Sequence, residues 1–271
     1  MKINADYSIL LHDLQFPEGP AFDKKGTLWF VEQLNGSISE YNNGMLTRHP
    51  VGGRPNGIAI DQTDLIWFCD SLKNEIRTFN PATKTVNTIV SHIDHIALNL
   101  PNDLAFDEIG NLVFTCSGEQ LHLGDGYFCV RSTVGKLVKI ETIRFYPNGL
   151  AFSKDRQQLY LSETGTQRIW KGSWDSKSLT WNNPEVFTET GGPVGPDGMA
   201  FDELGRLYVA VFGSSSIHVY DQKGNIDQKI KLSGANPTNC AFDPINKLGL
   251  VITEAEKGQI LSYKTNLKGV V

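Results

Sequence analysis

The segment PEGPAFD, residues 17–23, decides the fold because the chain repeats it. Five further segments share its pattern of a proline, a polar residue, small residues and a short apolar run, and successive copies begin 38, 46, 46, 49 and 41 residues apart. These copies are PNGIAID (55–61), PNDLAFD (101–107), PNGLAFS (147–153), PDGMAFD (196–202) and PTNCAFD (237–243). A repeat of this length predicts a propeller blade or another repeated unit of secondary structure.

Each repeat continues with further short apolar runs, such as GTLWF (26–30) and SISEY (37–41) in the first copy. The runs are rich in β-branched and aromatic residues and are bounded by turn residues, so they read as strands, and no segment sustains a helical period. Four antiparallel strands in each of six repeats predict an all-β, six-bladed β-propeller that forms one domain over residues 1–271. A twisted open sandwich is the alternative, which the blade-like period disfavours.

The last repeat is too short to supply four strands, because only 34 residues remain from Thr238 to Val271. The segment YSILLHDL, residues 7–14, precedes the first repeat and has the composition of a strand. Pairing the two ends of the chain would remove two exposed sheet edges. We therefore expect residues 7–14 to complete the last blade and close the ring.

The residue after each repeat proline should lie at an equivalent place around the central channel. All six of these residues carry a side-chain oxygen: Glu18, Asn56, Asn102, Asn148, Asp197 and Thr238. Turn sequences such as Pro-Asn-Gly also favour Asn and Asp, and this structural explanation stays open, above all for Asn56 and Thr238. Glutamate is a poor turn former, so Glu18 suggests a cation on the axis. Hard oxygen donors suit calcium, whereas zinc would favour His or Cys.

Three segments, EGPAFD (18–23), PNGLAFSKDRQQLYLSET (147–164) and GPDGMAFDELGRLYVAVFG (195–213), resemble the SMP-30/gluconolactonase/luciferin-regenerating family, and the resemblance covers nearly the whole chain. It implies a six-bladed propeller with one axial divalent cation, calcium first and Zn²⁺, Mn²⁺ or Mg²⁺ as alternatives. It also implies Glu18, Asn148 and Asp197 as metal ligands, Asp197 as the general base, and Asn102 as a substrate-binding residue. Members of the family include lactone hydrolases.

Two features bear on the substrate. Sugar-acid lactonases of this family often carry an arginine two residues before the asparagine that matches Asn102, whereas this chain has Leu100 there. Arg54 holds the corresponding place one repeat earlier and is a candidate substrate-binding residue. The insertion SGEQLHLGDGY (117–127) could be a lid, with Glu119 and His122 reaching the channel mouth, or a solvated surface loop.

Other chemistries have weaker support. His92 and His95 have the spacing of a metal-binding pair, but no further His or Cys adjoins them, so an exposed loop is favoured. The sequence lacks a G-x-S-x-G elbow, a P-loop and a G-x-G-x-x-G motif. The four cysteines form no C-x-x-C pair and are expected to be reduced core residues.

The charge balance limits the classes of partner that the protein is expected to bind. The net charge is −5 and no run of Lys or Arg occurs, which disfavours nucleic acid and anionic membranes. No apolar signal-peptide core opens the chain, so we expect a cytoplasmic protein, either a monomer or a weak homodimer. The leading hypothesis is a metal-dependent lactonase that acts on a small lactone. A non-enzymatic propeller that binds calcium or other proteins, and a strictosidine-synthase-like condensing enzyme, are the alternatives.

Overall fold

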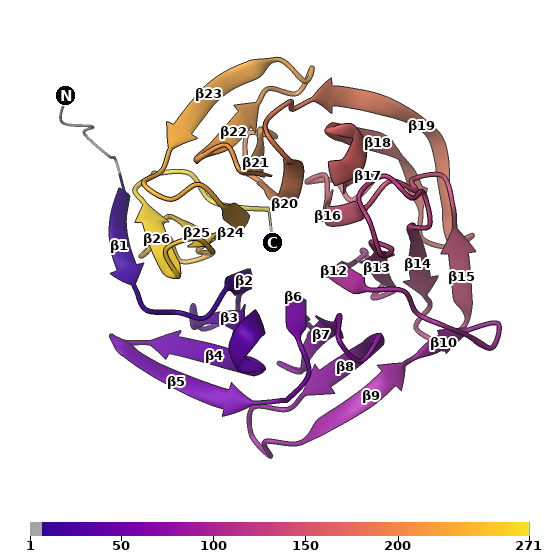
Figure 1. The fold of residues 1–271 in the computed structure, drawn as a ribbon, viewed down its shortest axis with the longest axis horizontal. Coiled ribbons are helices and arrows are strands. Elements are labelled where there is room, and N and C mark those ends of the chain that lie inside the picture. The colour runs from indigo at the N-terminus through magenta and orange to yellow at the C-terminus, as the bar shows by residue number, and fades with distance from the viewer. Residues whose placement is uncertain (1–6, 271) are drawn as a thin grey trace.

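The protein is described by a computed structural model over residues 7–270. Six four-stranded antiparallel sheets stand around a central channel, which confirms the predicted six-bladed β-propeller (Figure 1). Two short 3-10 helices, η1 (Gln33–Asn35) and η2 (Thr164–Thr166), and a small hairpin of β10 (His92–Ile93) and β11 (Ile96–Ala97) complete the regular structure of these residues. No helix within residues 7–270 combines the length and apolar character needed to span a membrane.

Each blade places the repeated segment on its innermost strand. The inner strands are β2 (Pro17–Phe22), β6 (Pro55–Ile60), β12 (Pro101–Phe106), β16 (Pro147–Phe152), β20 (Gly195–Phe201) and β24 (Pro237–Phe242). The second strands are β3 (Leu28–Glu32), β7 (Ile66–Asp70), β13 (Leu112–Cys116), β17 (Gln158–Glu163), β21 (Leu207–Phe212) and β25 (Leu250–Glu254). Because the inner strands face one another across the channel, equivalent residues of the six repeats surround it (Figure 1).

The two outer strands of each blade face the rim. The third strands are β4 (Ser37–Asn42), β8 (Glu75–Phe79), β14 (Tyr127–Arg131), β18 (Arg168–Asp175), β22 (Ser216–Tyr220) and β26 (Gln259–Tyr263). The fourth strands are β5 (Met45–Pro50), β9 (Val86–Val90), β15 (Leu137–Ile140), β19 (Thr180–Glu189), β23 (Ile226–Lys231) and β1 (Tyr7–Leu11). Strand β1 pairs antiparallel with β26, with Tyr7 opposite Tyr263, so the predicted closure of the ring by the N-terminal strand is confirmed.

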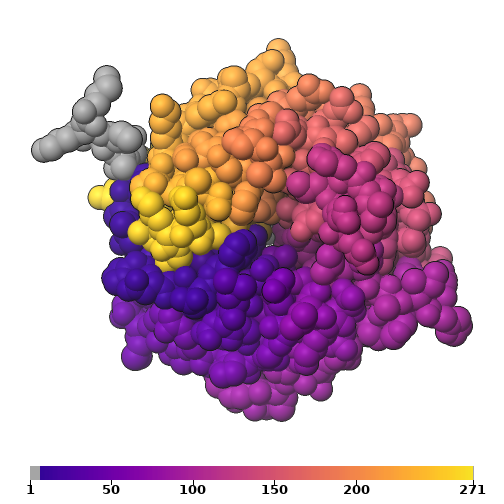
Figure 2. All heavy atoms as spheres, viewed as in Figure 1, coloured from indigo at the N-terminus to yellow at the C-terminus, as the bar shows by residue number. Residues whose placement is uncertain are grey.

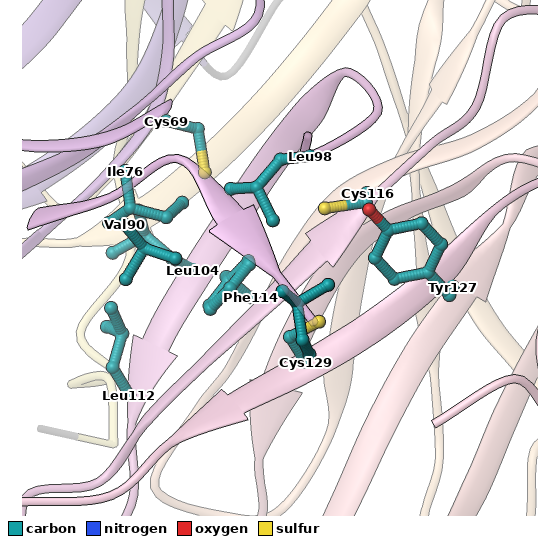
Figure 3. Close-up of a cluster of buried hydrophobic side chains, with 11 residues drawn as sticks. Cys69, Ile76, Val90, Leu98, Leu104, Leu112, Phe114, Cys116, Tyr127 and Cys129 are labelled. Atoms are coloured by element: carbon teal, nitrogen blue, oxygen red, sulfur yellow. The ribbon is translucent and has the colours of Figure 1, made fainter. Parts of the chain in front are cut away.

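The core consists of apolar layers between neighbouring blades. In the layer between the second and third blades, Cys69 and Ile76 pack with Leu104 and Phe114, all nearly excluded from solvent (Figure 3). Each fully buried side chain of this kind stabilises the fold by about 1.5–3 kcal/mol. The four cysteines are buried free thiols, as expected from the sequence.

A bulge in every inner strand turns polar residues towards the axis. In β16, Pro147 pairs with Glu163, but the next pair joins Leu150 to Leu161, so Asn148 and Gly149 together lie opposite a single residue. Strands β6, β12 and β20 are interrupted in the same way after the repeat proline, whereas the interruption in β2 follows Glu18 and that in β24 leaves only Thr238 unpaired. Such bulges redirect side chains, and here they explain how polar groups reach the channel from strands that otherwise pack apolar side chains.

Candidate metal centre

The ring residues converge on a cavity of about 410 Å³ at one mouth of the channel. Five of the six predicted ring residues line it: Glu18, Asn56, Asn102, Asn148 and Asp197. Figure 2 shows a hollow at the centre of the ring. Thr238 is the exception, because its hydroxyl donates to the carbonyl oxygen of Pro17 at 3.0 Å and the side chain is fully buried. The structural explanation therefore holds for Thr238.

Three carboxylate side chains near the channel axis have little contact with solvent. The exposed fractions are 5% for Glu18, 8% for Asp103 and 8% for Asp197. Burial raises the pKa of Glu18 to about 8, and the charge of Asp103 adds to the rise. Burial likewise raises the pKa of Asp103 to about 6. The pKa of Asp197 stands well above its ordinary value because of burial and then the charges of Glu18 and Asp103. Ionising this group of side chains is therefore costly without a cation.

Amide side chains hold these carboxylates in place. Asn148 donates from Nδ2 to the hydroxyl of Thr164 at 3.2 Å, which leaves its Oδ1 atom as the acceptor of this side chain. Its amide also counteracts the rise in pKa of Asp197. The side-chain amide of Asn239 counteracts the rise in pKa of both Glu18 and Asp103. Backbone amides contribute as well, since Gly19 donates to Glu18 Oε2 at 2.7 Å. These contacts fix the directions of the oxygen atoms around the axis.

Asp103 and Asn239 belong to a second ring that the sequence analysis missed. They occupy the next position of the repeat, where four other copies have glycine. The aligned repeats carried that signal, since a change from glycine to a polar side chain marks an unusual position. A Cβ atom at Gly57 would collide with the Asp103 carboxylate, and one at Gly198 would collide with Asn239. The glycines therefore leave the space in which these two side chains lie across the channel.

A second set of carboxylates anchors the loops that lead into the ring. Glu32, Asp70, Glu163 and Glu254 end the second strands of four blades and are buried. Each accepts a hydrogen bond from a backbone amide just before a repeat proline, at 2.9–3.1 Å. Charge-assisted bonds of this kind are stronger than neutral ones. They keep the bulged segments, and so the ring side chains, in a fixed orientation.

The donor set fits a hard divalent cation. Carboxylate and amide oxygens are the ligands that calcium prefers, and the cavity wall contains no Lys, Arg or His among the described residues. Within residues 7–270, no three side chains drawn only from His, Cys, Asp and Glu are arranged to bind a metal. The candidate set of Glu18, Asn148 and Asp197 combines two carboxylates with one amide oxygen.

The other predicted residues fall into two groups. Glu119, together with Gln120 and Leu121, brings the inserted loop to the cavity wall. Arg54 is exposed and does not line the cavity, and neither does Leu100. His122 of the same loop is also exposed and outside the wall. Both His92 and His95 are exposed at the β10–β11 hairpin.

Comparison with known proteins points to the family that the sequence motifs resemble. Residues 16–256 match the family described as SMP-30/Gluconolactonase/LRE-like region. Diisopropyl-fluorophosphatase of Loligo vulgaris is 30% identical over 185 residues, which cover 62% of this chain and 58% of that protein. A gluconolactonase of Zymomonas mobilis is 30% identical over 200 residues, which cover 67% of this chain and 52% of that protein. The matched segment thus spans little more than half the length of these curated relatives.

Solved structures share the whole fold at lower identity. A luciferin-regenerating enzyme superposes with a TM-score of 0.84 at 23% identity, covering 96% of both chains. The calcium-binding protein regucalcin of Agrobacterium tumefaciens superposes with a TM-score of 0.84 at 22% identity, covering 97% of this chain and 94% of that one. The family match covers most of the repeats and includes all the ring residues. The chain belongs to the SMP-30/gluconolactonase/LRE-like family.

Proposed function

We propose that this protein is a lactonase that depends on a divalent cation held by Glu18, Asn148 and Asp197, with calcium as the first candidate. The observation that carries the proposal is the pair of buried carboxylates, Glu18 and Asp197, in a ligand-sized cavity whose wall has no positively charged side chain among the described residues. Membership of a family whose relatives include a gluconolactonase supports a hydrolase. A bound cation would polarise the lactone carbonyl and make a nearby water molecule more acidic.

The side chains of this chain supply the remaining steps. Asp197 is a carboxylate with a raised pKa in the cavity, and we assign it as the general base. It takes a proton from the attacking water while the water oxygen bonds to the carbonyl carbon. The ring C–O bond then breaks, and the proton passes to the departing alkoxide oxygen, which gives a hydroxy acid. Asn102 and Glu119 line the same cavity and can orient the substrate by hydrogen bonds. We assign no role to Arg54, which lies outside the wall.

A panel of lactones tests this proposal. Purified protein would be stripped with a chelator and then assayed by acid release on γ- and δ-lactones, with and without Ca²⁺, Mn²⁺, Mg²⁺ and Zn²⁺. We expect hydrolysis that disappears in chelator and returns with at least one of these ions. Asn56→Ala, at a ring position outside the proposed ligand set, is the matched comparison for Asn148→Ala and should lose less metal affinity. Calcium binding without hydrolysis of any lactone would instead favour the non-enzymatic propeller.

A further inference from the structure

The wall of the cavity is divided by chemistry. Its polar part consists of the ring carboxylates and amides with Gln33, Glu119, Gln120 and Thr164, whereas Phe16, Leu121, Tyr146, Val194 and Phe212 bring large apolar groups to the same cavity. All five of these side chains are half-buried, so part of their apolar surface faces the cavity or solvent. A wet apolar wall of this kind lowers its free energy when a ligand covers it.

The charges in the cavity discriminate against anionic ligands. Glu18, Asp197 and Glu119 are acidic, and none of the residues described in the wall is Lys, Arg or His. One divalent cation would balance two of these carboxylates and leave no surplus positive charge. A substrate that carries its own carboxylate or phosphate would therefore enter an acidic site without a counter-charge.

The apolar wall also disfavours a ligand with many hydroxyl groups. Of its five side chains, only Tyr146 has a polar atom, so hydroxyl groups placed against the other four would lose their hydrogen bonds to water. This part of the wall therefore gives little preference for a hydroxylated substituent, and hydrogen bonds to a ligand come instead from polar residues elsewhere in the cavity, such as Gln33, Gln120 and Thr164. Binding is therefore favoured most by a ligand that is polar at one end and apolar at the other.

The inserted loop holds its part of the cavity wall in place before a ligand binds. Asp125 accepts hydrogen bonds from Asn99 Nδ2 and from the backbone amide of Glu119, both at 3.0 Å, which ties the two ends of the loop together. The carbonyl of Leu121 lies so close to Gly165 that a Cβ atom there would collide with it. A preformed wall of this kind spares a ligand the cost of ordering the loop.

We propose, resting on the lactonase function above, that the substrates are uncharged lactones that carry an alkyl or aryl substituent, with the ester group at the carboxylate–amide ring and the substituent against Phe16, Leu121, Tyr146, Val194 and Phe212. The cavity volume of about 410 Å³ is within the range of small-molecule sites and leaves room for such a substituent beside the lactone ring.

A homologous series tests the proposal with the metal-loaded protein. The substrates are δ-valerolactone and its 5-alkyl derivatives from methyl to hexyl, beside δ-gluconolactone and a lactone bearing a free carboxylate. We expect kcat/KM to rise about fourfold for each added methylene until the wall is covered. We also expect the uncharged alkyl lactones to exceed gluconolactone, and the carboxylate-bearing lactone to be the poorest substrate.

Two leucines of one loop provide matched variants. Leu121 lines the cavity, whereas Leu123 is 57% exposed and lies outside the wall. Leu121→Ala should reduce the gain per methylene to about twofold or less, and Leu123→Ala should leave it unchanged. Val194→Ala repeats the test from another segment of the wall if Leu121→Ala lowers the thermal stability.

The outcomes separate this inference from the function on which it rests. If no lactone is hydrolysed with any of the four metal ions, the lactonase proposal fails and takes the inference with it. If lactones are hydrolysed but gluconolactone is preferred tenfold or more, only the inference is overturned. A flat dependence on chain length, or an equal effect of Leu121→Ala and Leu123→Ala, would also overturn it.

Discussion

Replacing Asp197 with asparagine should make the metal-free protein more stable while it disables the site. The substitution keeps the shape of the side chain and removes one of three buried carboxylates. Because burial and the charges of Glu18 and Asp103 raise the pKa of Asp197 well above its ordinary value, the folded state bears a cost at neutral pH that the unfolded chain does not. An asparagine carries no such cost.

The size of the effect follows from the group's surroundings. The unfolded chain ionises this aspartate freely at pH 8, whereas burial and the charges of Glu18 and Asp103 oppose its ionisation in the folded state. Water entering the channel and small local rearrangements reduce the cost in a real protein. We therefore expect the free energy of unfolding to rise by about 1–3 kcal/mol in the absence of metal. For a chain of this size, Tm should rise by about 2–4 °C per kcal/mol.

Thermal unfolding at pH 8, in chelator and in excess calcium, measures the effect. Wild-type protein should gain about 3 kcal/mol at a calcium concentration 100 times Kd, whereas Asp197→Asn should gain much less. Asn148→Asp is the opposite control, because it adds a charge at a neighbouring ring position. It should lower the metal-free stability and increase the gain from calcium.

Activity distinguishes the role of Asp197 as a base from its role as a ligand. A positioned general base contributes about 10²–10⁴-fold, so Asp197→Asn should remain slow at saturating metal. Glu18→Gln removes a charge without removing the proposed base, and added metal should rescue it better. Equal and full rescue of both variants would remove the base assignment. Metal-free Asp197→Asn that is no more stable than wild type would refute the electrostatic reasoning.

Three further predictions concern closure, pH and the second ring. Deleting residues 1–14 removes β1 and exposes the edge of β26, so the truncated protein should aggregate or unfold at lower temperature; an unchanged monomer in size-exclusion chromatography would contradict this. The pKa of Glu18 is raised from 4.5 to about 8, so the metal-free protein holds more protons than the unfolded chain between these values; its stability in urea should fall as pH rises through that window, and calcium should offset the fall. Asn239→Leu removes an amide that counteracts the rise in pKa of Glu18 and Asp103 and should cost the metal-free protein about 1–3 kcal/mol in urea unfolding, whereas an unaltered midpoint would show that this amide does not stabilise the two carboxylates.

The fold could be predicted from the sequence because the repeated segment marks the inner strand of each blade. Every blade needs the same inner strand, so the proline, the polar residue and the apolar run recur at each copy. The short last repeat and the extra strand before the first one showed how the ring closes. The placement of the residues after each repeat proline around the channel could be predicted as well, because equivalent positions in a closed propeller surround one axis.

The details of the cavity were harder to predict because they depend on bulges and loops. In β12 the bulge contains both Asn102 and Asp103, so Asp103 lies beside the ring residue, whereas in β24 only Thr238 is left unpaired and Asn239 pairs with Thr253. Thr238 shares the ring position but donates its hydroxyl to a backbone carbonyl, which the sequence pattern does not encode. The apolar wall comes from loops of several blades, whose meeting is set by the closed ring and not by local sequence.

The most direct measurement of the central claim is a crystal structure of the protein grown in millimolar calcium. The account predicts one ion on the axis, bound by oxygens of Glu18, Asn148 and Asp197 at about 2.3–2.6 Å. An empty axis under these conditions, or an ion held instead by His92 and His95, would contradict it.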